Sequence, residues 1–485
     1  MTERKISIDP ITRLEGHGKI EIFLGDDGRP EDAVLQVPEL RGFEEFSRGR
    51  KGEEMPRITE RICGVCPEAH HFASTKALDA AFSTSPPPTA LSLRELLYNS
   101  YIFADHLLHL FYLGGPDFLV EDGNKAERNI VGVIKALGEE AGKKVIRARR
   151  LGHEAIEIIG GHQVHPVTGV PGGLSQGITS EEREELVSIG ESAVDFARET
   201  LELFREKVIN TEKFGSLVDD PEYSLNSYYM GLVDENGEVS FYDGDVRIVD
   251  PSGEEYLKTS SAEVMELLEE RVEPWTYVKF PYLKEVGWKD FQVGKDSGVF
   301  RVGPLARLNV ASGMKTDLAQ EEYERYVDHF DGTPVHQTYA YHWARLIEMV
   351  QAAERINELA SEEGITGDDL RTPVEEPGEG VGVIEAARGT LIHGYSLDDE
   401  GLVESSNMIV PTTSNSAALS ISIKQAALGA LEDGMNDDQV LNQVEMGFRP
   451  YDPCLACATH SVDGGLDIGL KIYDNEGKLV KEIER

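Results

Sequence analysis

Two Cys-x-x-Cys pairs stand near opposite ends of this chain. They are Cys63 with Cys66 and Cys454 with Cys457, and the 485 residues contain no other cysteine. A gap of two residues lets both thiolates of a pair turn toward one ion. Four soft sulfur ligands suit a transition metal. We therefore expect the two ends of the chain to meet at a metal site.

Two other uses of such pairs are open. A structural zinc ribbon also has two pairs, but these usually lie roughly 15 to 20 residues apart. Here most of the chain separates Cys66 from Cys454. A redox disulfide is the second alternative, although no small thioredoxin-like unit surrounds either pair. Spacing alone predicts a bound metal and leaves zinc and a redox metal equally open.

The residues around both pairs decide between these metals. Residues 61–70 (RICGVCPEAH) and 452–460 (DPCLACATH) resemble the two signature motifs of the nickel-iron hydrogenase large subunit. Segments 9–17, 41–44, 385–390 and 410–413 resemble further stretches of that family, in the family's order. Segments 41–46 and 54–57 look most like its cytoplasmic multimeric group, which includes methyl-viologen-reducing enzymes linked to heterodisulfide reductase and NAD(P)-linked bidirectional enzymes.

The resemblance implies a catalytic subunit that cleaves H2 reversibly and heterolytically into protons and electrons. In the family's arrangement, Cys63 and Cys454 would be terminal nickel ligands, and Cys66 and Cys457 would bridge nickel to iron. The iron would also carry carbon monoxide and cyanide. The alternative function is a zinc-stapled, non-catalytic scaffold subunit of a larger redox complex.

Heterolytic cleavage needs a base and a proton exit. Cys454, as a nickel thiolate, could accept the proton, and Glu15 resembles the family's relay glutamate. The other possibility is that Glu15 only forms a salt bridge with Arg13.

Arg388 resembles the arginine that lies over the open metal position. Asp105 and Asp452 would orient its guanidinium, whose planar fork of donors suits a polarised ligand. A plain buried ion pair is the alternative. The family usually has proline before this arginine, whereas this chain has Ala387. The residue before Arg388 is therefore a departure from the family pattern.

Five further residues match positions near the metals. His70 could hydrogen-bond a bridging sulfur, or be an ordinary core or surface histidine. Thr412 resembles a hydroxyl that hydrogen-bonds cyanide, or is an ordinary turn threonine. Glu44, His460 and the backbone carbonyl of Met408 resemble the ligands of a second site for a hard ion, usually magnesium but in some cases iron.

Composition limits the partners and the compartment. The chain has 47 basic and 88 acidic residues, a net charge of −41, which repels nucleic acid and anionic membranes. The sequence contains no run of about 18 apolar residues, so no membrane span is predicted. The first nine residues are charged and resemble no secretory signal, so we expect a cytoplasmic protein. The acidic surface is easiest to tolerate at high salt, which favours a halophilic source.

All four cysteines are needed at the active site, so none remains for an iron-sulfur cluster. Electrons must leave through another polypeptide. The resemblance implies an iron-sulfur small subunit, and further electron-transfer subunits are expected. The electron acceptor is not readable from this chain.

The predicted fold is α+β, with a mainly helical core bundle and peripheral β-hairpins. A first hairpin is predicted over residues 18–37, with its turn at Asp26–Gly28. Residues 225–312 read as a strand-rich insertion around one helix. Helices are predicted over residues 91–113, 179–208, 256–272, 320–330, 339–363 and 414–434.

Residues 1–460 are predicted to form the catalytic domain, and residues 461–485 a C-terminal extension. The extension reads as a hairpin with strands over 466–473 and 478–483, and its turn at Asp474–Gly477. An ordinary C-terminal hairpin is one interpretation. In the family, a dedicated protease removes such an extension after nickel insertion, so the active protein would end at His460.

Overall fold

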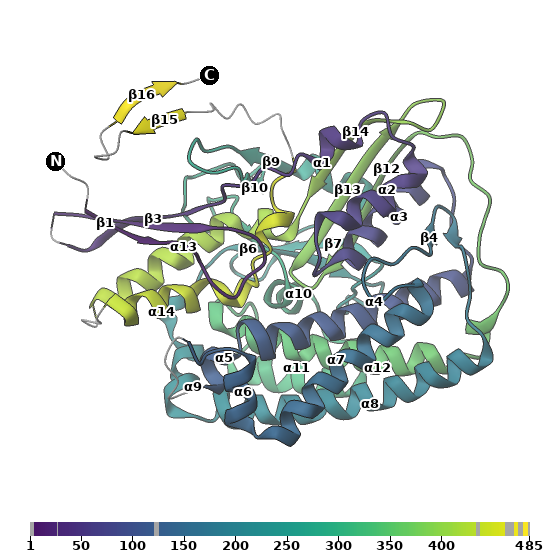
Figure 1. Ribbon diagram of the computed structural model, residues 1–485, viewed down its shortest axis with the longest axis horizontal. Helices are drawn as coiled ribbons and strands as arrows, with labels where there is room; N and C mark the ends of the chain where they lie inside the picture. The colour runs from purple at the N-terminus through teal and green to yellow at the C-terminus, as the bar shows by residue number, and fades with distance from the viewer. Residues whose placement is uncertain are drawn as a thin grey trace.

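The computed structural model describes residues 4–26, 28–120, 126–432, 437–460, 470–473 and 479–483. Long helices lie together in one half of the molecule, and small sheets lie beside them (Figure 1). The architecture is the α+β fold predicted from the sequence. No helix within the described ranges is long and apolar enough to cross a membrane.

Four long helices pack against one another to form the bundle, as the lower half of Figure 1 shows. They are α4 (Pro88–Leu108), α7 (Glu139–Gly160), α8 (Ser180–Phe204) and α12 (Tyr341–Ser361). A capping box between Thr179 and Glu182 begins α8, and Gly161 in the left-handed region ends α7. The helices predicted over 91–113, 179–208 and 339–363 are confirmed as α4, α8 and α12.

The N-terminal sheet has three antiparallel strands in the order β1–β2–β3. They are β1 (Arg4–Ile8), β2 (Lys19–Leu24) and β3 (Pro30–Gln36). The predicted first hairpin is β2–β3, although Asp27 of its turn lies outside the described residues. Helix α13 (Pro411–Glu432), predicted over 414–434, packs on β3.

A second antiparallel sheet, β12–β13–β14, packs on helix α3 (Pro67–Ala81). Its strands are β12 (Glu379–Ala386), β13 (Gly389–Leu397) and β14 (Val403–Ile409). Gly380 and Gly382 allow this contact, because a Cβ on either would lie 2.2 to 2.3 Å from the α3 backbone. The sheet thereby holds the β12–β13 turn and the end of β14 near the start of α3.

The helix predicted over 256–272 is wrong. Strand β8 (Glu255–Thr259), a 3-10 helix (Ser261–Leu267) and strand β9 (Leu268–Arg271) occupy this segment. Strand β8 pairs with β7 (Asp245–Val249), and β9 pairs with β10 (Phe280–Leu283). These backbone hydrogen bonds between strands are not visible in the local helical pattern.

The rest of residues 225–312 contains several strands, as predicted. Its other strands are β6 (Tyr228–Val233), β7 (Asp245–Val249), β10 (Phe280–Leu283) and β11 (Phe300–Arg301). Helix α11 (Asp317–His329), predicted over 320–330, follows them.

Several shorter α-helices and strands lie between these elements. They are α1 (Phe43–Ser47), α2 (Met55–Thr59), α5 (Pro116–Leu119), α6 (Ile130–Leu137), α9 (Glu212–Asp219), α10 (Pro304–Val310), α14 (Asp437–Phe448), β4 (Gly169–Val170) and β5 (Gly173–Leu174). In the extension, β15 (Leu470–Tyr473) pairs antiparallel with β16 (Leu479–Ile483), as predicted. Residues 461–469 and 474–478 lie outside the described residues, and the predicted turn at Asp474–Gly477 is among them.

Candidate metal centre

The four cysteine sulfurs meet at one buried point. Cys63 follows a 3-10 turn, Cys66 directly precedes α3, and Cys454 and Cys457 lie on the loop after α14. The sulfurs lie within 4.8 Å of one another, with 3.4 Å from Cys63 to Cys454 and 3.5 Å from Cys66 to Cys457. All four are free thiols, so their arrangement suits a thiolate-bound transition metal.

Backbone contacts hold the early and late segments together at this point. Leu455 donates its backbone N–H to the Glu15 carbonyl at 2.8 Å, and Glu15 donates to the Pro453 carbonyl at 3.3 Å. Gly16, at φ +85°, is required here, because a Cβ would lie 2.6 Å from the Ala456 nitrogen. The two ends of the chain therefore meet through main-chain pairing as well as through the cysteines.

Burial and hydrogen bonds between the thiols shift their pKa values in different directions. Hydrogen bonds from Cys454, Cys457 and Cys66 hold the pKa of Cys63 well below its usual range. Burial raises the pKa of both Cys454 and Cys457 well above theirs. Four thiolates at such short range repel one another strongly, so a metal ion is the natural counter-charge for them.

Glu15 lies directly against the cluster. Its Oε2 accepts hydrogen bonds from Cys454 Sγ and from the Ala456 backbone N–H, both at 3.1 Å. Burial, followed by the charge of Cys63, raises the pKa of Glu15. The alternative of a simple salt bridge with Arg13 is wrong, because Arg13 pairs with Asp117.

Arg388 stands in the turn between β12 and β13, held by two carboxylates. Its Nη1 lies 2.9 Å from Asp105 Oδ2 and its Nη2 lies 3.0 Å from Asp452 Oδ2. Burial lowers the pKa of Arg388, but these carboxylates outweigh burial and raise it, so the guanidinium stays charged. Ala387 donates its backbone N–H to the Tyr101 hydroxyl at 3.3 Å, a bond that proline could not make.

A cavity of about 10 Å³ separates Arg388 from the sulfurs of Cys66, Cys454 and Cys457. His70 and Thr412 also line it. The lining thus combines sulfur ligands, two residues that can donate hydrogen bonds from their side chains in Arg388 and Thr412, and several apolar side chains.

The two remaining residues at this cavity have defined partners. Thr412 Oγ1 accepts the backbone N–H of Cys454 at 3.0 Å, so Thr412 fixes a cysteine in addition to facing the cavity. His70 Nδ1 lies 3.2 Å from His393 Nε2, and His393 Nδ1 lies 2.9 Å from the Tyr395 hydroxyl. Neither His393 nor Tyr395 belongs to one of the motifs, so neither was predicted as a site residue from the sequence. Their spacing of two on β13 is the only sequence sign that both face one side of a strand.

Glu44, Met408 and His460 also lie together. Glu44 Oε1 accepts the Met408 backbone N–H at 2.8 Å, and the Glu44 N–H points to the His460 carbonyl at 3.4 Å. His460 is 3% exposed, and neither ring nitrogen has a hydrogen-bond partner among the described residues. Burial lowers the pKa of His460 to about 3, so its ring is neutral. Glu44 is half-buried. A carboxylate, and an imidazole without a hydrogen-bond partner among the described residues, are ligands that suit a cation.

Comparisons with known proteins place this centre in a family. The family described as nickel-dependent hydrogenase matches residues 41–134 and 223–460, and the family described as HoxL-like matches residues 5–40. The chain belongs to the nickel-dependent hydrogenase family. It is a large, catalytic subunit of the nickel-iron class, and the zinc-scaffold alternative is not favoured.

Relatives of full length support this assignment. The chain is 44% identical, over 99% of both proteins, to a protein of Archaeoglobus profundus named as an iron-sulfur subunit of F420-non-reducing hydrogenase. It is 36% identical to the NAD-reducing hydrogenase HoxS subunit beta of Cupriavidus necator, over 99% of this chain and 100% of that protein.

A solved structure shows the same fold. The crystal structure of an NAD+-reducing [NiFe]-hydrogenase in the H2-reduced state matches with a TM-score of 0.88 and 37% identity. The match covers 94% of this chain and 99% of that chain. The enzyme is thus an oxidoreductase acting on H2, and the family and the four-cysteine cluster support nickel and iron at its centre.

Proposed function

We propose that this chain performs reversible heterolytic cleavage of H2 at a nickel-iron centre held by Cys63, Cys66, Cys454 and Cys457. The observation that carries the proposal is the convergence of four buried free thiols on one point beside Glu15. When bound, the two metals activate H2 so that it splits between a metal and a base. Cys454 and Glu15 lie 3.1 Å apart, so a proton released at the sulfur reaches a carboxyl through one hydrogen bond.

Arg388 and Thr412 would serve the diatomic ligands of the iron. Carbon monoxide and cyanide on the iron are expected for this class of centre. The charged fork of Arg388 and the hydroxyl of Thr412 border the small cavity and can donate hydrogen bonds to a cyanide nitrogen. His70, held by His393, borders the same cavity and would tune a bridging sulfur.

We assign a second metal site to Glu44, His460 and the backbone carbonyl of Met408. The buried imidazole of His460, which has no hydrogen-bond partner in the described part of the chain, supports this assignment. Oxygen ligands from Glu44 and Met408 favour a hard ion, so magnesium is preferred over iron.

Electrons would leave to an iron-sulfur small subunit, then to further electron-transfer subunits in the cytoplasm. The relatives are named as subunits of hydrogenases that are F420-non-reducing or NAD-reducing, which supports an assembly of this kind. The acceptor would be heterodisulfide reductase or NAD(P). The net charge of −41 supports a high-salt habitat and opposes contact with nucleic acid or membranes.

The catalytic domain would comprise residues 1–460, and a maturation protease would remove residues 461–485. The burial of His460 against Glu44 supports processing, because a ligand at the new end of the chain could close the site after metal insertion.

Metal analysis of the purified complex tests the proposed function. We expect nickel together with an excess of iron, because the iron-sulfur clusters of the partner subunits add to the iron of the centre. We also expect infrared bands of carbon monoxide and cyanide, and H2-dependent reduction of methyl viologen. Zinc in place of nickel, with no such bands, would support the scaffold function instead.

A further inference from the structure

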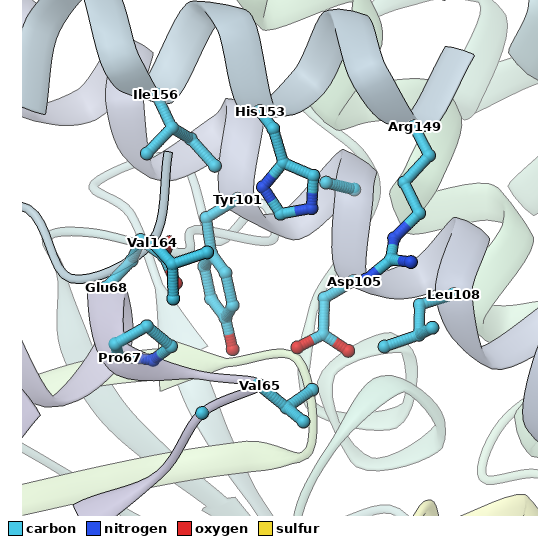
Figure 2. A pocket seen from close by; sticks show the side chains of 12 residues that line it. Val65, Pro67, Glu68, Tyr101, Asp105, Leu108, Arg149, His153, Ile156 and Val164 are labelled. Atoms are coloured by element: carbon cyan, nitrogen blue, oxygen red, sulfur yellow. The ribbon is translucent and has the colours of Figure 1, made fainter. Parts of the chain in front are cut away.

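A second cavity, of about 100 Å³, lies beside the first cysteine loop between α4 and α7 (Figure 2). We call it the chamber. Helix α4 contributes Tyr101, Asp105 and Leu108, and α7 contributes Arg149 and His153. The spacings of three and four residues place each set on one face of its helix. The chamber therefore occupies the seam between two helices of the bundle.

The inner end of the chamber reaches the carboxylate that holds Arg388. Asp105 Oδ2 binds Arg388, but the buried Oδ1 has no hydrogen-bond partner among the described residues. Figure 2 shows this carboxylate and the Tyr101 hydroxyl on the same side of the cavity. Gly64 and Val65 of the first cysteine loop also line it. The chamber thus adjoins the metal site without forming part of it.

Two of the residues that line the chamber lie near the surface. Val164 is 40% exposed and His153 is half-buried. His153 Nδ1 lies 3.1 Å from the Gln163 carbonyl, which only accepts, so Nδ1 carries the proton. Burial lowers the pKa of His153, which favours the neutral ring, and in that ring Nε2 carries a lone pair. The Nε atom of Arg149 likewise has no partner within the described part of the chain.

These polar groups favour water over a gas as the occupant. Apolar cavities stay dry, whereas a polar cavity with unpaired donors and acceptors holds ordered water. A volume of about 100 Å³ has room for several waters. Among the described residues, Asp105 has an oxygen and Arg149 a nitrogen without a hydrogen-bond partner. These two atoms and Nε2 of His153 can bind water in the chamber.

We propose that the chamber holds a hydrogen-bonded file of waters that conducts protons between Asp105 at the metal site and solvent at His153. It is a second proton exit, separate from Glu15, and it depends on the proposed function. Oxidation of one H2 yields two protons and two electrons. The electrons leave to the iron-sulfur clusters of the partner, and the protons leave through Glu15 or through the chamber.

The occupant can be identified in crystals of the complete hydrogenase complex. We expect ordered waters within hydrogen-bond distance of Asp105 Oδ1 and His153 Nε2. Crystals pressurised with xenon should show no xenon in the chamber. Xenon bound there, with no ordered water, would make the chamber an apolar gas pocket and overturn the proposal.

The route can be tested by exchange of D2 with solvent protons in the same complex. In Glu15→Gln, about 1% of the exchange rate should remain, because a relay carboxyl supplies roughly 10². Adding His153→Asn, which keeps an N–H for the Gln163 carbonyl but removes the free nitrogen, should lower the remaining rate a further ~10-fold. Leu108→Phe, which fills the chamber, should do the same. His162→Asn, at an exposed histidine outside the chamber, is the control and should not change it.

An equal residual rate in Glu15→Gln and in both double variants would overturn the second exit. This outcome differs from failure of the proposed function. If the chain is no hydrogenase, the unchanged complex itself shows no exchange, whereas failure of the chamber leaves the exchange of the unchanged complex intact.

Discussion

Ala387 gives the roof over the metal site a hydrogen bond that the family's usual proline cannot make. Its backbone N–H donates to the hydroxyl of Tyr101, a buried residue of α4. The departure from the family pattern thus links the turn that carries Arg388 to helix α4.

Replacing this alanine tests the link. Ala387→Pro should keep the metals but lower the free energy of unfolding by about 0.5–1.5 kcal/mol, the net value of one hydrogen bond. Tyr101→Phe should cost a similar amount, and the double variant should cost little more than either single one. Chemical denaturation of the purified chain measures all three. Full additivity would show that the two residues are not coupled.

The cysteine assignment predicts a loss of metal. Cys454→Ser replaces a soft thiolate by a hard oxygen of much higher pKa, so nickel should be absent and H2 oxidation abolished. Nickel analysis and methyl viologen reduction measure the two effects. A Cys454→Ser protein with full nickel and activity would rule out this cysteine as a terminal ligand.

The relay assignment predicts the opposite pattern. Glu15→Gln keeps the shape of the side chain and removes its titrating group, so metal content should stay normal while turnover falls by at least roughly 10². Glu39→Gln, which removes a carboxylate whose partner is the exposed His17, is the matched control and should keep turnover. Undiminished turnover in Glu15→Gln would remove this residue from the proton path.

Residues within the motifs could be located from the sequence, because each motif is local. Cys63, Glu15 and Arg388 are examples, and packing brings them together as one group. Tyr101 and His393 could not be located in this way. Their role comes from contacts with Ala387 and His70, which are far away in the chain, and no short pattern encodes such contacts.

At the scale of elements, strong helical periodicity was a sound guide to α4, α8 and α12. It failed at residues 256–272, where strand pairing outweighs local propensity. The β12–β14 sheet was not predicted either. Gly380 and Gly382 weaken the strand signal of β12, yet they are there because α3 packs so closely on that strand.

The joint between α4 and α12 is a buried polar network. His106 on α4 lies 3.0 Å from Glu348 on α12, and both Nε and Nη2 of Arg307 bind that carboxylate. Burial lowers the pKa of His106 to about 4. The joint therefore depends on a neutral imidazole, which makes it sensitive to pH.

This joint predicts a loss of stability in mild acid. The unfolded chain binds a proton on His106 near pH 6.5, whereas the folded chain binds it only near pH 4. Between these values the unfolded state holds more protons, so stability falls as the pH falls, by at most about 1.4 kcal/mol per pH unit for this group. His106→Gln keeps a donor for Glu348 and should flatten this slope in denaturation measured from pH 7 to 5. His162→Gln should not, and an unchanged slope in His106→Gln would contradict the argument.

At the scale of the whole molecule, both ends of the catalytic region are tied to one point. Segment 41–44 pairs with the end of the second motif, since Arg41 donates its N–H to the Thr459 carbonyl at 2.8 Å. Glu15 pairs with the neighbouring loop, and the cysteines complete the contact. Closing this point orders the late segment against the early ones, so metal insertion and the last step of folding should be linked.

That link predicts the form of the active protein. His460 is buried between the early segment and the metal site, yet 25 residues follow it in the sequence. We expect nickel-replete, active protein to end at His460, with the cut before Ser461, because release of the extension would let the new end stay packed as a metal ligand. Intact mass spectrometry measures the end point. Cys454→Ser, which should lack nickel, is the matched control and should keep the chain to Arg485. Active enzyme that retains the full extension would contradict processing, and His460 would then have to bind its metal from within an unbroken chain.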